Sequence, residues 1–198
     1  MPDLPSLGWD GLRAKLASSN QHKLDELQPA LPGWEIDLLE ASVFPEEAGA
    51  TYYDNARTKA GFGRTRSDPD FWILGEDSGL EIDALGGRPG ITSARWAADP
   101  IARALEELDG AANRGARYVC ELVCLSPELD EYRGTGVLKG RIADEPRGTE
   151  GFGYDPIFIP DGEVMTVAEL GNSWKASNSH RARAAAALTA ALRQSRDV

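Results

Sequence analysis

Apolar residues recur along several segments of the chain at helical spacing. Leucines at three- and four-residue intervals over 24–31 predict a helix, and Asn20 is a suitable N-cap before it. Thr51 begins a second predicted helix, because Asp54 three residues later completes a capping-box pattern. Two more helices are predicted, one around 101–108 and an alanine-rich one from about 179 to 194.

Other segments have the apolar runs and alternation of β-strands. Residues 71–74 form a continuous apolar run, which predicts a strand buried on both faces and ending at Glu76 and Asp77. Strands are also predicted over 15–18, 117–125, 132–142 and 156–159. Because helices and strands are mixed through the whole length, we expect an α/β or mixed α+β fold with a central mixed sheet.

Length and charge narrow the class of protein. The 198 residues contain no internal repeat or long linker and are expected to fold as one unit. The 32 acidic and 21 basic residues give a net charge of -11, which opposes non-specific binding to nucleic acid. No apolar stretch has the length of a membrane span, and the first residues lack the pattern of a signal peptide. We therefore expect a cytoplasmic protein.

The two cysteines, Cys120 and Cys124, fall on one face of a predicted strand. We interpret them as small core thiols. The two histidines, His22 and His180, lie far from them in sequence and do not complete a zinc-binding pattern.

Two adjacent carboxylates and a hydroxyl, Glu76, Asp77 and Ser78, follow the predicted buried strand and are flanked by glycines. Carboxylates are the oxygen ligands that Mg²⁺ prefers, and one of them could act as a general base toward water. The glycines would let a ligand approach closely. The alternative is a solvated acidic turn.

Two helix segments carry residues suited to phosphate. Ser18, Asn20 and Lys23 place hydroxyl, amide, backbone N–H and ammonium groups at a helix start, although an ordinary N-cap with an exposed lysine explains the same pattern. Asn55 and Lys59 share a face of the second helix, downstream of Glu46 and Glu47. A solvated polar face is the alternative for this second group.

Cations gather at the predicted start of the last helix, where the helix dipole disfavours them. They are Lys175, His180 and Arg181, and a bound anion or an electron-rich base carbonyl would offset the conflict. Exposed cations at small cost are the alternative. The segment 151–156 adds Phe152, Tyr154 and Asp155, which suits stacking on a flat ring or a tight turn.

These groups follow one another in a definite order along the chain. They lie within 18–26, 54–60, 77–80, 87–95, 151–156 and 179–181. In this order and spacing the sequence resembles the inosine triphosphate pyrophosphatase family, also called XTP/dITP diphosphatase or the Ham1-like family, from about 16 to 192.

The resemblance implies a nucleoside-triphosphate diphosphatase. Such an enzyme hydrolyses noncanonical purine nucleotides, chiefly ITP, dITP and XTP, to the monophosphate and pyrophosphate, with Mg²⁺ and usually as a homodimer. The implied fold is one domain over 1–198, an elongated mixed sheet flanked by helices, with two lobes and the substrate cleft between them. Residues 1–13 or so look like an N-terminal extension.

The resemblance also assigns roles to single residues. It makes Asp77 the general base, with Lys59 beside it as a catalytic, phosphate-contacting residue, and associates Glu47, Glu76 and Asp77 with the metal. It makes Asp155 and Arg181 the readers of the 6-oxo edge of the base. The substrate-binding positions are Ser18, Asn20, Lys23, Asn55, Ser78, Phe152, Tyr154, Asp155, Lys175, His180 and Arg181.

The chain departs from the family pattern at a few positions. Glu76 stands for a usual Asp, Asp54 for a usual Glu and Trp96 for a usual Tyr, and the stretch between Trp96 and Tyr118 is short. Two alternative hypotheses follow. One is a pathway-specific pyrophosphatase with altered base preference, and the other is a nucleotide-binding module without catalytic activity.

Overall fold

The computed structural model describes residues 11–196 and contains one six-stranded mixed sheet. Its strand order is β2-β1-β3-β4-β5-β6. Strand β1 (Leu12–Leu16) pairs in parallel with β2 (Trp34–Leu38) and β3 (Trp72–Ile82). The remaining strands are antiparallel to their neighbours; they are β4 (Gly115–Leu125), β5 (Glu131–Ile142) and β6 (Phe158–Pro160).

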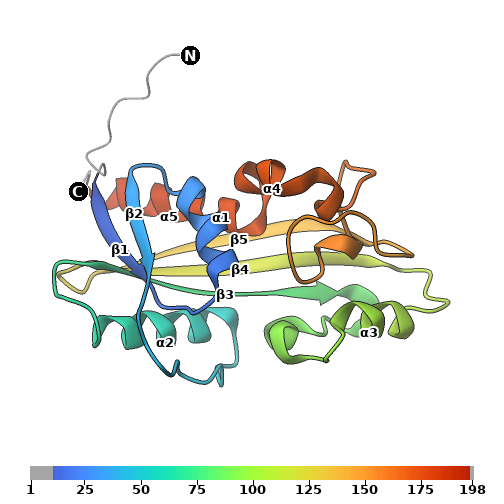
Figure 1. Ribbon diagram of the computed structural model, residues 1–198, viewed down its shortest axis with the longest axis horizontal. Coiled ribbons are helices and arrows are strands. Elements are labelled where there is room, and N and C mark those ends of the chain that lie inside the picture. Colours follow the sequence, from blue (N-terminus) through green and yellow to red (C-terminus); the bar gives the residue numbers. More distant parts are fainter. Residues whose placement is uncertain (1–10, 197–198) are drawn as a thin grey trace, which may run out of the picture.

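Helices cover both faces of this elongated sheet (Figure 1). On one face lie α1 (Gln21–Ala30), α4 (Val167–Asn178) and α5 (His180–Arg196). On the other lie α2 (Tyr52–Arg64), α3 (Pro100–Glu107) and the 3-10 helix η2 (Gly90–Arg95). Two short 3-10 helices complete the fold, η1 (Asp83–Leu85) and η3 (Asp155–Ile157). The predicted mixed α+β class with helices around a central mixed sheet is confirmed.

Two larger apolar cores share the long strands, and a smaller one packs α2 against Ile73 and Val123. One contains Leu74 of β3 and Cys120 and Cys124 of β4, packed against α1 and α5. The other contains Leu80 and Ile82 of β3, packed against α3, η3 and α4. The prediction of core thiols is confirmed, since both cysteines are buried. The stretch of β3 between these two cores is the polar segment 75–79, so Glu76 and Asp77 lie between them.

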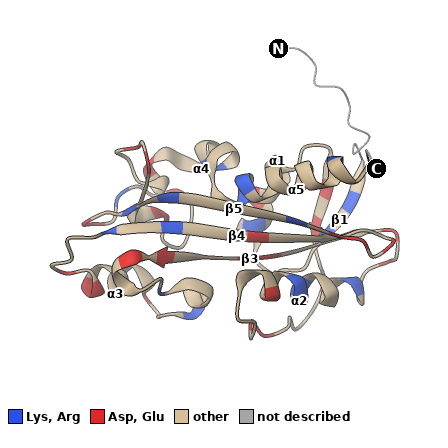
Figure 2. Ribbon diagram, turned by 180° about the vertical axis from the view of Figure 1, so that it is seen from behind, with Lys and Arg blue, Asp and Glu red and all other residues tan. Residues whose placement is uncertain are grey.

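Acidic and basic residues are intermixed along the long strands and the surrounding helices (Figure 2). Opposite charges face each other across neighbouring strands. Arg117 contacts Glu81 at 2.6 Å, and Arg133 contacts Glu121 at 2.7 Å. Such cross-strand pairs neutralise much of the sheet surface locally.

Local signals located the helix starts correctly. The Asn20 side chain accepts a hydrogen bond from the backbone of His22, and Thr51 and Asp54 form the predicted capping box. Strand β3 was predicted wrongly, because it does not end at Glu76 and Asp77 but continues to Ile82. Ten successive pairs with β4 hold it through the acidic residues.

Two elements were not predicted. Strand β2 alternates apolar Trp34, Ile36 and Leu38 with acidic residues, a readable strand pattern. Helix α4 begins with the capping box of Thr166 and Glu169, but Gly171 interrupts it with φ 84° and ψ 175°. The interruption breaks the helical period, so the sequence shows no continuous helical pattern over this segment.

The chain ends limit two predictions. Residues 1–10 of the expected N-terminal extension lie outside the described residues, and its last two, Leu12 and Arg13, already belong to β1. Within 11–196, the helices are all too short or too polar to cross a membrane.

Candidate active site

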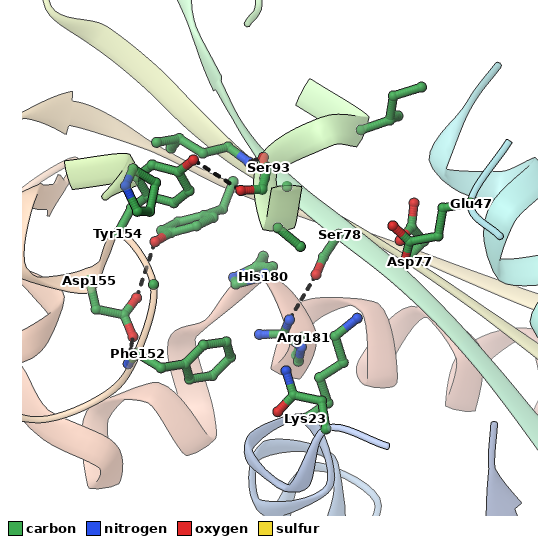
Figure 3. Close-up of a pocket in the computed structure, with 18 residues that line it drawn as sticks. Lys23, Glu47, Asp77, Ser78, Ser93, Phe152, Tyr154, Asp155, His180 and Arg181 are labelled. Atoms are coloured by element: carbon green, nitrogen blue, oxygen red, sulfur yellow. Dashed lines mark hydrogen bonds between the residues drawn. The ribbon is translucent and has the colours of Figure 1, made fainter. Parts of the chain in front are cut away.

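The polar centre of β3 lines the aromatic one of two adjoining cavities. One is lined by aromatic and ring-binding groups, among them Tyr118, Phe152, Tyr154, Asp155 and Arg181. The other is lined by hydroxyls and cations, among them Ser18, Ser19, Lys59 and Arg95. Asn20, Lys23, Glu47 and Ala94 line both. Figure 3 shows the aromatic residues on one side of the pocket, and Glu47 and Asp77 together on the other.

Lys59 is the centre of the acidic end. Its ammonium group contacts Glu47 Oε1 at 2.5 Å, Asp77 Oδ1 at 2.9 Å and the backbone carbonyl of Glu76 at 3.0 Å. Asn55 donates to Asp77 Oδ2 at 2.9 Å. Both Lys59 and Asp77 are buried, so neither the solvated acidic turn nor the solvated helix face is present.

Burial and the charge of Lys59 shift the pKa values of the Asp77 and Glu47 carboxyl groups. Burial raises the pKa of Asp77, although Lys59 acts in the opposite direction. Burial alone would also raise the pKa of Glu47, but the hydrogen bond and charge of Lys59 bring it below its usual value. Two carboxylates therefore share one ammonium group, and their pKa values shift in opposite directions.

Glycines at both ends of the acidic segment let protein backbone approach β3. A Cβ at Gly75 would lie 2.0 Å from the carbonyl oxygen of Ala56 in α2, and one at Gly79 would lie 2.2 Å from the carbonyl oxygen of Gly90. The prediction that these glycines let a ligand approach was wrong, because protein backbone lies against them. They let α2 and η2 pack against the strand, which brings Asn55 and Lys59 onto Asp77.

Glu76 points to the opposite face of the strand, as the alternation of side chains requires. It is fully buried, and it contacts Lys23 Nζ at 2.6 Å and Arg181 Nε at 3.0 Å. Burial opposes its ionisation, yet Arg181 and Lys23 lower its pKa well below the usual range. Its two carboxylate oxygens are thus directed at cations of α1 and α5, whereas Glu47 and Asp77 share Lys59.

A chain of buried ion pairs continues from Arg181 toward the aromatic cavity. Arg181 also donates to Ser78 Oγ at 2.7 Å and contacts Glu26 at 3.4 Å. Lys175 contacts Glu26 at 2.7 Å and Asp155 at 2.6 Å. Glu26 was not predicted as a site residue, although its position one helical turn after Lys23 was a usable signal.

The cation cluster differs from its prediction. Lys175 lies in the last turn of α4, where the helix dipole favours a cation, and not at the start of α5. At the start of α5, the conflict between Arg181 and the dipole is offset by Glu76 and Glu26. Arg181 is buried, so the alternative of exposed cations is wrong.

Phe152 is the partly open aromatic residue of the cavity. Its ring stacks on His22 with centroids 5.0 Å apart, and the cations of Lys175 and Arg181 lie 4.5 Å and 5.2 Å from its centroid. Tyr154 is buried and donates to the Ser93 carbonyl at 3.1 Å. Phe152 is therefore the better placed of the two aromatics to stack on a ligand ring.

His180 is a neutral part of the wall. It is buried and stacks on Tyr118 with centroids 4.6 Å apart. Burial, together with the charge of Arg181, lowers its pKa from 6.5 to about 3. The imidazole therefore stays uncharged in the folded protein at neutral and mildly acidic pH.

This shift predicts acid sensitivity of the fold. Between the two pKa values the unfolded chain binds a proton that the folded protein does not, so stability falls as the pH drops from 6.5 toward 3. His180 should contribute a loss of about 2 kcal/mol between pH 7 and pH 5. Denaturant unfolding of the wild type and of His180→Phe at both pH values measures it. An equal pH dependence in the two proteins would contradict the assignment.

The start of α1 is an ordinary helix cap and also has groups suited to binding phosphate. Asn20 is an N-cap, and the Asn20 backbone N–H donates to Ser18 Oγ at 3.1 Å. Lys23 is not an exposed lysine, because its side chain is only 15% exposed and pairs with Glu76. The helix start and Lys23 both face the second cavity, which suits an anion.

The carboxylates of the site can supply some, but not all, of the ligands of a divalent cation. Within residues 11–196, no three His, Cys, Asp or Glu side chains are gathered so that they could hold a metal ion by themselves. Mg²⁺ commonly uses one or two carboxylates together with water and substrate phosphates. Glu47 and Asp77, both on Lys59 at the junction of the cavities, match that requirement.

Comparison with known proteins decides the family. A family model described as the Ham1 family matches residues 14–191. The chain belongs to the Ham1 family. The resemblance inferred from the motifs is thereby confirmed.

Ham1-family relatives with assigned names match nearly the whole chain. A protein of Deinococcus deserti named dITP/XTP pyrophosphatase is 41% identical over 194 residues, covering 93% of this chain and 91% of that protein. One of Leifsonia xyli with the same name is 42% identical, covering 92% and 96%.

Solved structures agree with the fold. The Ham1 protein of Staphylococcus aureus superposes with a TM-score of 0.80 at 33% identity, covering 92% of this chain and 99% of that chain. A nucleoside-triphosphatase, dITP/XTP pyrophosphatase, from Mycobacterium abscessus has a TM-score of 0.68 at 39% identity, covering 89% and 97%. The six-stranded mixed sheet flanked by helices is therefore a fold of the Ham1 family.

Proposed function

We propose that this Ham1-family protein is a Mg²⁺-dependent pyrophosphatase that converts ITP, dITP and XTP to the monophosphate and pyrophosphate. One observation carries the proposal: an aromatic cavity and a cationic cavity adjoin at Glu47 and share Asn20 and Lys23. A purine ring in the first and a phosphate tail in the second would place the α-phosphate at the carboxylates. The bond that breaks is then the one between the α- and β-phosphates.

Asp77 is the proposed general base. It accepts hydrogen bonds from Asn55 and Lys59, which fix its orientation, and its raised pKa makes it a better proton acceptor. In the reaction its carboxylate takes a proton from a water molecule aimed at the α-phosphorus. The water oxygen then bonds to that phosphorus, and pyrophosphate leaves into the cationic cavity.

Lys59 and Lys23 supply positive charge along the phosphate tail. Each is partnered by a carboxylate in the described structure, so substrate phosphates would exchange with these ion pairs. Glu47 and Asp77 would hold Mg²⁺, which supplies charge neutralisation and polarisation of the phosphate oxygens when bound. Ser18 and Asn20 at the start of α1 add hydrogen-bonding groups for the same tail.

The base is proposed to be selected at its 6-position. Arg181 can only donate hydrogen bonds, so it matches the 6-oxo group of hypoxanthine or xanthine and opposes the 6-amino group of adenine. Glu76, Glu26 and Ser78 hold its guanidinium in place. Phe152 offers its ring for stacking, and Asp155, paired with Lys175, lines the same cavity.

We also propose that the protein acts in the cytoplasm and as a homodimer, as the family resemblance implies. The oligomeric state is checked by sedimentation velocity at micromolar concentration. A monomer at every concentration would contradict the dimer without bearing on the chemistry.

A nucleotide panel with product identification tests the proposed function. The protein is incubated with ITP, XTP, dITP, ATP and GTP plus Mg²⁺, and nucleotides and phosphates are separated. Monophosphate and pyrophosphate from the first three are the expected products. Release of orthophosphate with a diphosphate would contradict the bond choice, and a different preferred base would favour the pathway-specific enzyme. Nucleotide binding without any product would favour the module without catalytic activity.

A further inference from the structure

Glu47 lies in a segment without regular secondary structure. Residues 39–51, between β2 and α2, form neither helix nor strand, and most of their side chains are partly or fully exposed. We call this segment the Glu47 loop. A proposed metal ligand on such a loop needs contacts that fix its position, because an unrestrained loop loses conformational entropy on binding.

Two cations hold the Glu47 side chain, one at each carboxylate oxygen. Lys59 of α2 contacts Oε1 at 2.5 Å, and Arg95 at the end of η2 contacts Oε2 at 2.6 Å. Arg95 also donates from Nη2 to the backbone carbonyl of Glu47 at 2.9 Å. One guanidinium thus fixes both the side chain and the backbone of the same residue.

The contact between Arg95 and Glu47 is more specific than an ordinary surface ion pair. Its guanidinium binds at two points, which a single-point lysine contact does not reproduce. It lines the cationic cavity together with Lys59 and Lys23. It also joins two parts of the fold, since η2 packs on β3 at Gly79 while the Glu47 loop precedes α2.

We propose that Arg95 is a positioning residue that secures the Glu47 loop to the end of η2 and thereby pre-arranges Glu47 for the metal. The link to the metal rests on the proposed function, whereas the link to the loop does not. Each Glu47 oxygen keeps a further lone pair for a cation after accepting one hydrogen bond. The contact with Arg95 therefore orients the carboxylate without blocking it.

Two variants separate the effect of the two-point contact of Arg95 from the effect of its charge. Arg95→Lys keeps the charge but cannot bind two points in the same way, and Arg95→Met removes both. If charge alone mattered, Arg95→Met would bind the metal more tightly, because a repelling cation is gone. If the two-point contact matters, both variants should bind the metal more weakly. The charge of Arg95 has little effect by itself, because its half-exposed side chain is screened by solvent.

The closing experiment first measures amide hydrogen exchange of the protein without nucleotide or metal. Peptides within 40–50 should exchange about tenfold faster in both variants, and peptides of β4 should not change. In ITP hydrolysis, the Mg²⁺ concentration for half-maximal rate should rise about tenfold, while kcat at saturating Mg²⁺ stays within about threefold.

Arg117→Met is the matched control. Arg117 also pairs with a glutamate at 2.6 Å, and the exposed fractions of the two side chains, 51% and 22%, are close to the 46% and 23% of Arg95 and Glu47. It should leave both readouts unchanged. Unchanged exchange of the Glu47 loop in Arg95→Met would overturn the proposal, even if the enzyme has another substrate. An unchanged Mg²⁺ requirement with weaker inhibition by pyrophosphate would overturn it in favour of direct contact with the leaving group.

Discussion

Replacing Asp77 by Asn is expected to lower kcat for ITP by about 10³-fold, the usual scale for removal of a general base. An amide has nearly the shape of the carboxylate but cannot take a proton from water. Lys59 and Asn55 donate to different oxygens of Asp77, so the amide keeps one of these contacts through its carbonyl oxygen and presents its NH2 group to the other donor. The rate is measured at saturating ITP and Mg²⁺ by pyrophosphate release.

The fold must be compared alongside this rate. Asp37→Asn serves as a control, because Asp37 is 72% exposed and pairs with Lys15 outside the cleft. Circular dichroism and thermal unfolding should show the wild-type fold for both variants. A folded Asp77→Asn enzyme with a rate close to the wild type would remove Asp77 from the base role.

Replacing Arg181 is expected to change both stability and base preference. Arg181→Met leaves the buried carboxylates of Glu76 and Glu26 with one cation fewer, which should destabilise the fold by about 3–5 kcal/mol. Arg181→Lys keeps a charge near Glu76 and should lose less. In both variants the ratio of kcat/KM for ITP over ATP is expected to fall by at least about tenfold, because the donor facing the 6-position is lost or displaced.

Urea unfolding and the two specificity constants are measured on the same preparations. Arg183→Met is the control on the same helix, since Arg183 is exposed and bonds the backbone carbonyl of Val137 outside the cleft. A folded Arg181→Lys enzyme with an unchanged ITP-over-ATP ratio would contradict the specificity argument, whatever its stability.

Features set by short-range interactions were predictable from the sequence. The N-cap at Asn20 and the capping box of Thr51 and Asp54 depend on residues two or three positions apart, so the local pattern contains the whole interaction. The long strands β4 and β5 were also predicted nearly to their ends, because apolar alternation extends over most of their length.

The course of β3 was not predictable in this way. A local pattern assigns Glu76 and Asp77 to solvent, because it does not contain the partners that make their burial favourable. Lys59 lies 18 positions from Asp77, and Arg181 lies 105 positions from Glu76. Only the folded chain brings these charges together, so the sequence predicted a strand end where the strand continues.

The site residues also fall into two groups: those indicated by sequence motifs and those whose role depends on residues far away in the sequence. The ordered motifs and the family resemblance together gave part of the lining of the cavities as site residues, including Asn20, Lys59 and Arg181, but not Tyr118 or Arg95. Glu26 was missed, because its function depends on Lys175 and Arg181, which follow about 150 positions later. The role of the two glycines beside the acidic pair also depended on which backbone lies against them.

The position of water attack tests the account most directly. ITP is hydrolysed in water enriched in ¹⁸O with Mg²⁺ present, and the products are separated for mass spectrometry. The two cavities meet at Glu47, and Lys59 joins Glu47 to Asp77, which predicts one ¹⁸O atom in the monophosphate and none in the pyrophosphate. Label in pyrophosphate, or in orthophosphate released with a diphosphate, would place the attack on another phosphorus and contradict the account.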